Sequence, residues 1–401
     1  MFKSLFLLIL LCASQLYPTS KDVIRDRIER VVAKLPKTTR AAILIYNPLT
    51  QDTVYKNNHT VSMIPASNTK LFTTATALNL MEGDFSIATK LLTEDFNIKD
   101  GEINGNLYIK GYGNSMFTEA DLASMVLELK NAGVTKVTGN IIGDDTYFDD
   151  IYTRDDWITD EVANVKLPPI SAIVIDRNRT VTYRKRGKRM RSYVSNISNP
   201  PLHAAQILKE KLTANGIEVL LSPAKGIAPD NIYTISEKRI ILRELIKQIN
   251  KRSDNFLAEC LFKTIGAAAS GQQGNAFYST QAILDFIDDN GIYAYGTSVV
   301  DGSGISRFNQ ITVGAIAGLL EKMYFDLRNF EDYYESFSIA GVDGTLRNRM
   351  IGTSAENNFH GKTGTLNGVT SLSGYVTTKS NEDLVVSMIF EFKRGGSGFH
   401  K

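Results

Sequence analysis

The chain has 401 residues, with 45 Lys and Arg against 43 Asp and Glu and a formal net charge of +2 at pH 7. This balance gives no global reason to expect binding to nucleic acid, and the length predicts two or three structural units rather than one compact domain. The chain has 4 His residues, none in a metal-ligand spacing, so a zinc hydrolase is a poor fit.

The first residues have the order of a secretory signal peptide. Lys3 is followed by the apolar run 5–11 and then by small residues, the pattern of a charged region, a hydrophobic region and a cleavage site. We assign residues 1–18 to this leader and expect export to the periplasm.

Two cysteines bear on processing and stability. Cys12 is a candidate for lipid attachment, but the bulky Leu11 before it makes a lipoprotein anchor the less favoured reading. Removal of the leader leaves only Cys260, so the mature chain is expected to have no internal disulfide.

The regions next to the two ends are expected to build one sheet. Residues 22–35 have the apolar spacing of a helix, residues 41–46 are β-favouring, and residues 53–55 follow a polar turn as a hairpin partner. Residues 374–376 and 384–390 are also strand-like and are expected to close the same sheet.

The middle of the chain, from about residue 88 to about residue 230, has the mixed texture of an α+β insert. Strands are expected at 105–110 and 137–142, and helices at 120–132 and 202–215. After Ile235 we expect helical structure again.

Ser67 and Lys70 lie three residues apart at the start of a helical pattern, so their side chains should project from one face of its first turn. A Ser hydroxyl becomes an effective nucleophile when a nearby base accepts its proton, and a desolvated Lys can be that base. The motif is short enough to occur by chance, in which case it is an exposed helix start.

Two further short motifs follow. Ser253-Asp254-Asn255 lies between helical patterns, and in isolation it is an ordinary helix N-cap. Lys362-Thr363-Gly364-Thr365 precedes the closing strands and in isolation is a surface turn. On an edge strand, however, its cation and hydroxyls could hold the carboxylate of a substrate lying against the strand.

The three motifs in this order are those of β-lactamases and penicillin-binding proteins. The chain resembles the low-molecular-mass class C penicillin-binding proteins, the D-alanyl-D-alanine carboxypeptidase/endopeptidase family (peptidase S13), and the stretches 139–144, 301–307 and 341–350 add to the resemblance. It implies an α+β fold with a transpeptidase-like core, an antiparallel sheet flanked by helices. The core is expected at 19–88 and 234–401, with an inserted α+β domain at 89–233.

The resemblance implies serine acyl transfer on peptidoglycan stem peptides that end in D-alanyl-D-alanine. Ser67 would attack the carbonyl of the penultimate D-alanine, with Lys70 as the base. Backbone N–H groups of Ser67 and Thr365 would hold the oxyanion. Ser253, linked to Lys362, would carry the proton to the leaving amine, while Asn255 would hold the substrate amide.

The third motif is implied to be the substrate-binding strand. Lys362, with the hydroxyls of Thr363 and Thr365, would bind the terminal carboxylate, and Gly364 belongs to the same strand. β-Lactam antibiotics would form slow acyl-enzymes, and no metal or organic cofactor is implied.

The spacing of the motifs is also family-like. Ser67 and Ser253 are 186 positions apart (253 minus 67), and the resemblance places the inserted domain between them. Asp144 falls where the family carries an acidic residue that reaches the active site and would meet the amino group of a diaminopimelate side chain. A solvated or turn-forming Asp is the alternative.

The chain departs from the family pattern in two places. Where a third domain is expected, residues 176–198 read as a short β-hairpin turning near Gly187 with a dense basic tip at 184–191. The tip could contact anionic cell-wall polymer or lipid headgroups, which leaves peripheral membrane association open, but a solvated turn is favoured. After Phe390 no pattern for a final helix follows.

Two other functions are considered. A serine β-lactamase or esterase on the same core would need a group that activates water. No clear Glu-x-x-x-Asn follows the Ser-Asp-Asn element, and no Tyr-x-Asn takes that element's place. A non-catalytic cell-wall-binding homologue conflicts with the presence of all the proposed reactive residues.

Overall fold

The computed structural model describes residues 21–157, 167–186 and 189–393. The predicted leader at 1–18, the lipidation candidate Cys12 and the turn residue Gly187 therefore lie outside the described residues. Within these ranges no helix has the length and apolar character that crossing a membrane requires.

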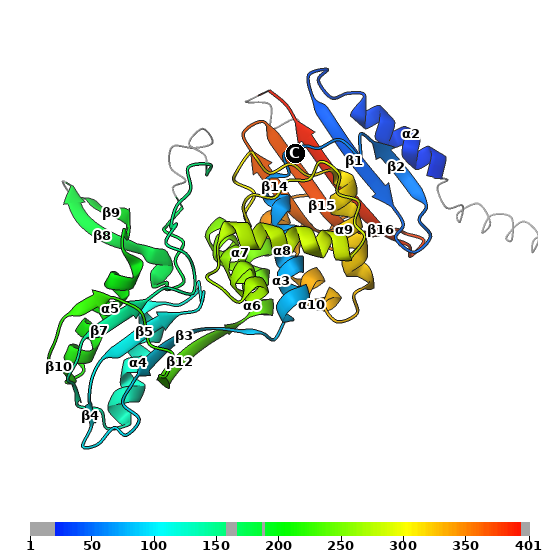
Figure 1. Ribbon diagram of the computed structural model, residues 1–401. Coiled ribbons are helices and arrows are strands. Elements are labelled where there is room, and N and C mark those ends of the chain that lie inside the picture. The colour runs from blue at the N-terminus through cyan, green and yellow to red at the C-terminus, as the bar shows by residue number, and fades with distance from the viewer. Residues whose placement is uncertain (1–20, 158–166, 187–188, 394–401) are drawn as a thin grey trace, which may run out of the picture.

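The core is built on a six-stranded antiparallel sheet in the order β13-β14-β15-β16-β1-β2 (Figure 1). β1 pairs with β16, with Ala42 opposite Ile389, so segments from the two ends of the chain close one sheet as predicted. The strands are β1 Arg40–Tyr46, β2 Thr53–Asn57, β13 Ser338–Ile339, β14 His360–Leu366, β15 Val369–Thr377 and β16 Asp383–Glu391.

Helices flank this sheet. α2, Lys21–Val32, packs against β2, and α9, Val313–Phe325, packs against β16 and β1. α3, Thr69–Met81, is buried on nearly every side, as expected of a helix at the centre of a domain. It is enclosed with the help of α6 Leu242–Arg252, α7 Asn255–Ser270, α8 Ala276–Asp289 and α10 Phe330–Glu335.

The insert has its own sheet, in the order β11-β7-β5-β3-β12, and its own apolar core, which includes Leu91, Ile109, Met125 and Leu208. A second small sheet has the order β10-β6-β4. The elements are β3 Ser86–Thr93, β4 Glu102–Ile103, β5 Leu107–Gly111, α4 Glu119–Asn131, β6 Lys136–Val137, β7 Ile141–Asp144, α5 Pro200–Ala214, β10 Glu218–Val219, β11 Pro223–Lys225 and β12 Tyr233–Ile241.

The structure corrects the expectation for the end of the insert. Helical structure was expected after Ile235, but β12 continues to Ile241, and α6 begins at Leu242. The physical reason is long-range pairing, because β12 lies antiparallel to β3 along its whole length. The two strands therefore carry the insert's sheet beyond the expected limits at 89 and 233.

Residues in the region of the expected third domain form only a hairpin of two strands, β8 Arg179–Arg186 and β9 Arg189–Asn196. The hairpin is a separate two-stranded sheet. In Figure 1 it projects away from the three other sheets.

Candidate active site

The site lies where the N-terminal ends of α3 and α7 meet β14 (Figure 1). Ser67 lies in a single 3-10 turn, Ala66–Asn68, that leads directly into α3, and Lys70 lies in the first turn of α3. The Nζ of Lys70 donates a hydrogen bond of 3.0 Å to the Oγ of Ser67. The three-residue spacing thus does bring the hydroxyl and the amine together.

Lys70 is completely buried. Its Nζ also donates to the Oδ1 of Asn255 at 2.6 Å and to the backbone oxygen of Ser303 at 2.5 Å. Burial lowers the pKa of the Lys70 amine to about 8, although nearby acidic groups oppose the shift. A Lys with a pKa near neutrality is neutral often enough to accept a proton from a Ser hydroxyl.

Ser253 ends α6 in the left-handed conformation, with φ of 55°, and the next helix begins at Asn255. This sharp connection places Ser253 within 2.9 Å of the Nζ of Lys362, which donates to its Oγ. Asp254 caps α7 by accepting from the backbone N–H of Leu257 at 3.0 Å. The segment is therefore both a helix cap and part of the site.

Lys362 lies in β14 and is also completely buried. Burial and the nearby Lys70 hold the pKa of its amine well below the ordinary value. β13 pairs only with His360 and Gly361, so among the described residues no strand pairs with the outer edge of β14 beyond Gly361. That edge is open to an extended ligand.

Gly364 explains how closely β14 approaches the nucleophile. A Cβ added there would lie 2.9 Å from the backbone N of Ser67 and 2.8 Å from the backbone O of Pro65. Ser371 of β15 fixes the same turn, because its Oγ donates to the Pro65 oxygen at 2.7 Å. The exposed Thr365 follows Gly364, so the backbone of the third motif runs directly beside Ser67.

A loop behind Lys70 was recognised in the sequence only as family-like. The Ser303 oxygen that accepts from Lys70 is held in place because the Ser303 N–H donates to Oε1 of Glu259 at 2.7 Å. Asp301 accepts from the backbone N–H groups of Gly304 and Ser306, each at 2.7 Å. Glu259 and Asp301 are both buried, and burial raises the pKa of each carboxyl, to about 8 for Glu259.

Arg177 of the insert also reaches the site, and the sequence analysis did not single it out. Its Nη1 and Nη2 donate to the two carboxylate oxygens of Asp254, each at 2.9 Å, and its guanidinium lies 4.8 Å from the ring centroid of Phe256. Arg177 adopts φ of 61° between two other residues with positive φ, Asp176 and Asn178. Three consecutive non-Gly residues in this left-handed region indicate a strained backbone that the surrounding structure holds in place, a feature typical of functional sites.

The structure shows the surroundings of Asp144, for which a substrate contact was predicted. Asp144 is completely buried within the insert. One carboxylate oxygen accepts from the N–H and hydroxyl of Thr146, and the other accepts from the N–H of Ala228 and lies 2.9 Å from the Nζ of Lys110. These partners all belong to the insert, so Asp144 anchors a turn there, and its contact with a diaminopimelate side chain stays a prediction.

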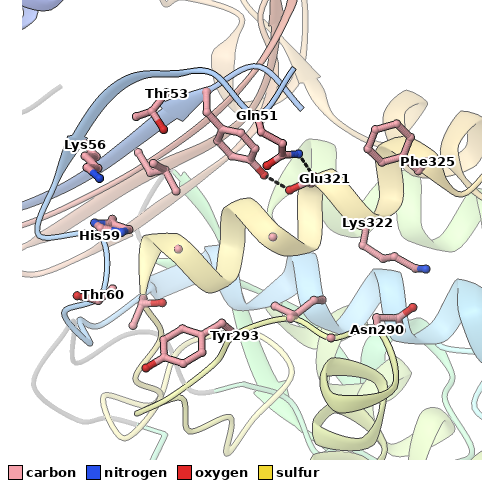
Figure 2. A pocket seen from close by; sticks show the side chains of 17 residues that line it. Gln51, Thr53, Lys56, His59, Thr60, Asn290, Tyr293, Glu321, Lys322 and Phe325 are labelled. Atoms are coloured by element: carbon pink, nitrogen blue, oxygen red, sulfur yellow. Dashed lines mark hydrogen bonds between the residues drawn. The ribbon is translucent and has the colours of Figure 1, made fainter. Parts of the chain in front are cut away.

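A pocket of about 670 Å³ lies elsewhere, between the β1–β2 hairpin, α9 and the end of α8 (Figure 2). Its polar centre is Glu321, which accepts from the Tyr46 hydroxyl at 2.7 Å and from the Gln51 amide. No residue of the three motifs lines it. The candidate site is therefore defined by the convergence of the motifs and not by this cavity.

Comparisons with known proteins agree with the geometry. The family model for the D-Ala-D-Ala carboxypeptidase 3 (S13) family matches residues 24–195 and 185–395. The chain is 26% identical to a D-alanyl-D-alanine carboxypeptidase of Actinomadura sp. (strain R39), covering 85% of this chain and 76% of that protein. It is 25% identical to the D-alanyl-D-alanine carboxypeptidase DacB of Haemophilus influenzae, covering 93% and 89% respectively.

The fold is similar to solved structures as well. The crystal structure of penicillin binding protein 4 from Haemophilus influenzae superposes with a TM-score of 0.81 at 23% identity, covering 92% of this chain and 94% of that one. The same protein complexed with a β-lactam gives a TM-score of 0.76 at 22% identity, covering 91% and 93%.

Proposed function

Because the chain belongs to the D-Ala-D-Ala carboxypeptidase 3 (S13) family, we propose that it cleaves the D-alanyl-D-alanine end of peptidoglycan stem peptides through an acyl-enzyme on Ser67. The observation that carries this assignment is the pairing of two buried amines with two serines, Lys70 with Ser67 and Lys362 with Ser253. Two Ser–Lys pairs can serve the two proton transfers of an acyl transfer, one from the nucleophile and one to the leaving group.

In the first step, the Oγ of Ser67 attacks the carbonyl carbon of the penultimate D-alanine, and neutral Lys70 accepts the hydroxyl proton. The developing oxyanion receives hydrogen bonds from the backbone N–H groups of Ser67 and Thr365, which the close approach at Gly364 brings together. Ser253 gives its proton to the departing amine and is reprotonated through Lys362. Terminal D-alanine leaves.

In the second step, water attacks the acyl-enzyme and releases the shortened peptide.

The Oδ1 of Asn255 accepts from Lys70, which leaves its amide N–H₂ to donate to the substrate backbone. Before cleavage, Lys362, with Thr363 and Thr365, holds the carboxylate of the terminal D-alanine along the open edge of β14. The same D,D bond occurs in peptide cross-links, so the chemistry extends to endopeptidase activity.

β-Lactams are the expected inhibitors, because their reactive amide would meet the same nucleophile and oxyanion donors. The β-lactam complex of the Haemophilus influenzae protein supports this expectation. Export to the periplasm, where peptidoglycan lies, remains a proposal that rests on the leader-like pattern at 1–18. Peripheral attachment to a membrane is likewise only a prediction.

Labelling with a fluorescent penicillin tests the proposal. We expect one covalent label on the wild-type protein, located on the peptide that contains Ser67, and no label on Ser67→Ala. Ser62→Ala is the matched control. Among the described residues its hydroxyl donates only to the backbone oxygen of Gly296, so this variant should label normally. Labelling that persists in Ser67→Ala would show that the nucleophile is another residue.

D-Alanine release from a soluble pentapeptide gives a second, independent readout. We expect release by the wild type and none by Ser67→Ala, with both proteins folded by circular dichroism. Rapid turnover of penicillin, instead of a persistent acyl-enzyme, would favour the β-lactamase alternative.

A further inference from the structure

Within the described residues no further strand pairs with the β8–β9 hairpin. It forms a sheet by itself, and its side chains are exposed on both faces apart from the half-buried Arg179. A lone two-stranded hairpin is only marginally stable in water. Its eight cross-strand pairs therefore present two free faces to whatever lies next to the protein.

One face of the hairpin is cationic. Side chains alternate between faces along a strand, so Arg184 and Arg186 share a face with their cross-strand partners Arg191 and Arg189. None of the four has a carboxylate partner among the described residues, and the two strands contain no Asp or Glu. Like charges placed directly opposite destabilise a hairpin, and an anion bound across them removes that cost.

The other face is equally exposed and carries most of the large apolar side chains of the hairpin, together with Lys185 opposite Met190. Val181 pairs with Val194, and Tyr183 and Met190 lie further toward the tip on the same face. Their exposed fractions are 51%, 59%, 68% and 62%. The hairpin thus offers a charged face and an apolar face to one partner.

The root of the hairpin is fixed beside the candidate active site. The Ile197 N–H donates to the Asn178 oxygen at 3.0 Å, which closes the base of the hairpin. Asn178 directly follows Arg177, whose guanidinium binds Asp254 of the second motif. The base of the hairpin is therefore tied to the segment that carries Ser253 and Asn255, and β8 and β9 extend from this base.

We propose that the hairpin is a binding arm for polymeric peptidoglycan. The four arginines contact carboxylates of stem peptides near the one being cleaved, and the apolar face, with Tyr183, packs against the sugar rings of the glycan. This inference rests on the proposed function, because it assigns the arm to the same polymer on which Ser67 acts. A lipid surface would fit the charges too, but the attachment of the arm to the active-site rim favours the substrate polymer.

The test compares two variants that each lose four positive charges. The arm variant carries Arg184→Gln, Arg186→Gln, Arg189→Gln and Arg191→Gln. The control variant changes four exposed lysines of other elements, none of which makes a side-chain hydrogen bond or ion pair with the described residues: Lys34→Gln, Lys37→Gln, Lys99→Gln and Lys130→Gln. Both are assayed as full-length protein for co-sedimentation with purified insoluble peptidoglycan, for D-alanine release from it, and for penicillin acylation.

We expect the arm variant to bind the polymer about tenfold more weakly than the wild type, as when several exposed ion pairs are lost together, and to release less D-alanine from it. Penicillin acylation and cleavage of a soluble pentapeptide should be unchanged, and the control variant should behave as the wild type. Added salt should weaken wild-type binding and reduce the difference between the variants.

Equal polymer binding by the arm and control variants would overturn the proposal. So would unchanged polymer binding together with lost sedimentation on anionic phospholipid vesicles, because the arm would then serve a lipid surface. Failure of the proposed function looks different, since the wild type itself would then show neither penicillin acylation nor D-alanine release.

Discussion

Arg177 of the insert and Asp254 of the segment between α6 and α7 are joined by two N–H···O bonds of 2.9 Å. Burial alone would raise the pKa of Asp254, but the bonds from Arg177 and from the Leu257 N–H outweigh it and hold the pKa below its ordinary value. Because Ser253 and Asn255 flank Asp254, the insert controls the position of two proposed catalytic groups.

Replacing Arg177 should therefore slow acylation. We expect Arg177→Gln to lower the penicillin acylation rate constant about tenfold and the unfolding free energy by about 1 kcal/mol, the cost of a partly exposed charge-assisted pair. Arg27→Gln, in the exposed part of α2, is the control. In a double-mutant cycle with Asp254→Asn, the losses of acylation rate caused by the two substitutions should not add. Full additivity would show that the pair does not couple the insert to the site.

The acylation rate should rise with pH through the pKa of Lys70, about 8. The base must be neutral to accept the Ser67 proton, so the active fraction grows about tenfold per pH unit below that value and levels off above it. Stopped-flow acylation by a chromogenic β-lactam between about pH 6 and pH 10 measures the profile. A rate that is still rising steeply at about pH 10, as the ordinary Lys value of 10.5 would give, would mean that burial does not tune the amine.

Glu259 should shift that midpoint. In their charged forms Asp301, Glu259 and Asp254 favour the ammonium form of Lys70 and raise its pKa. Because burial raises the pKa of Glu259 itself to about 8, its charge acts on Lys70 mainly in the upper part of the profile. Glu259→Gln removes this charge but can still accept from the Ser303 N–H, so the midpoint should move to lower pH while the loop stays in place.

Glu259→Ala supplies the structural comparison. It removes the acceptor as well as the charge, so it should lower the acylation rate at every pH. An unshifted profile in Glu259→Gln would show that this carboxyl only holds the loop. Lys362, the other nearby cation, is unchanged in both variants.

The sequence could predict the local parts of this site and not the long-range ones. The Ser67–Lys70 contact follows from helical spacing, and the three motifs with the resemblance predicted the fold class and the sheet shared by both ends of the chain. The Arg177–Asp254 pair joins residues 77 positions apart, and nothing local marks either side chain as its partner.

The wrong start of the helix and the unforeseen partners of Asp144 have the same origin. The segment from Ile235 to Ile241 carries apolar residues that fit either a helix or a strand, and its pairing with β3 decides in favour of a strand. Asp144 has the family's residue type at the expected position, but only the folded insert shows that Lys110, Thr146 and Ala228 occupy its carboxylate.

Gly364 should not tolerate a side chain. A Cβ there would lie 2.2 Å from the Ser371 Oγ as well as within 3 Å of the turn that holds Ser67, so Gly364→Ala should push β14 away from the nucleophile. We expect penicillin acylation to fall by about a hundredfold or more, since a displacement of about 1 Å in a catalytic arrangement has that effect. Gly318→Ala in α9, where the nearest atom would be 3.3 Å away, should acylate normally.

Asp144→Ala should reduce stability without changing the chemistry. Removing one partner of a buried ion pair leaves Lys110 uncompensated, and we expect a loss of about 3 kcal/mol in the unfolding free energy measured by urea denaturation. Lys110→Met added to Asp144→Ala should recover part of it, because the remaining charge is then removed. The folded fraction should still be acylated by penicillin and release D-alanine from a diaminopimelate pentapeptide at the wild-type rate.

The pH dependence of the same variant tests the anchoring role. Burial raises the pKa of Asp144, but the bonds from Thr146, Ala228 and Lys110 lower it further than burial raises it, so the folded pKa lies below the ordinary value of 3.8. Its contribution to stability is therefore fully present above pH 3.8 and is lost as the pH falls through the lower folded pKa. The difference in unfolding free energy between wild type and Asp144→Ala should shrink in that acidic range. A selective loss of pentapeptide cleavage at neutral pH, with stability unchanged, would instead return Asp144 to the substrate.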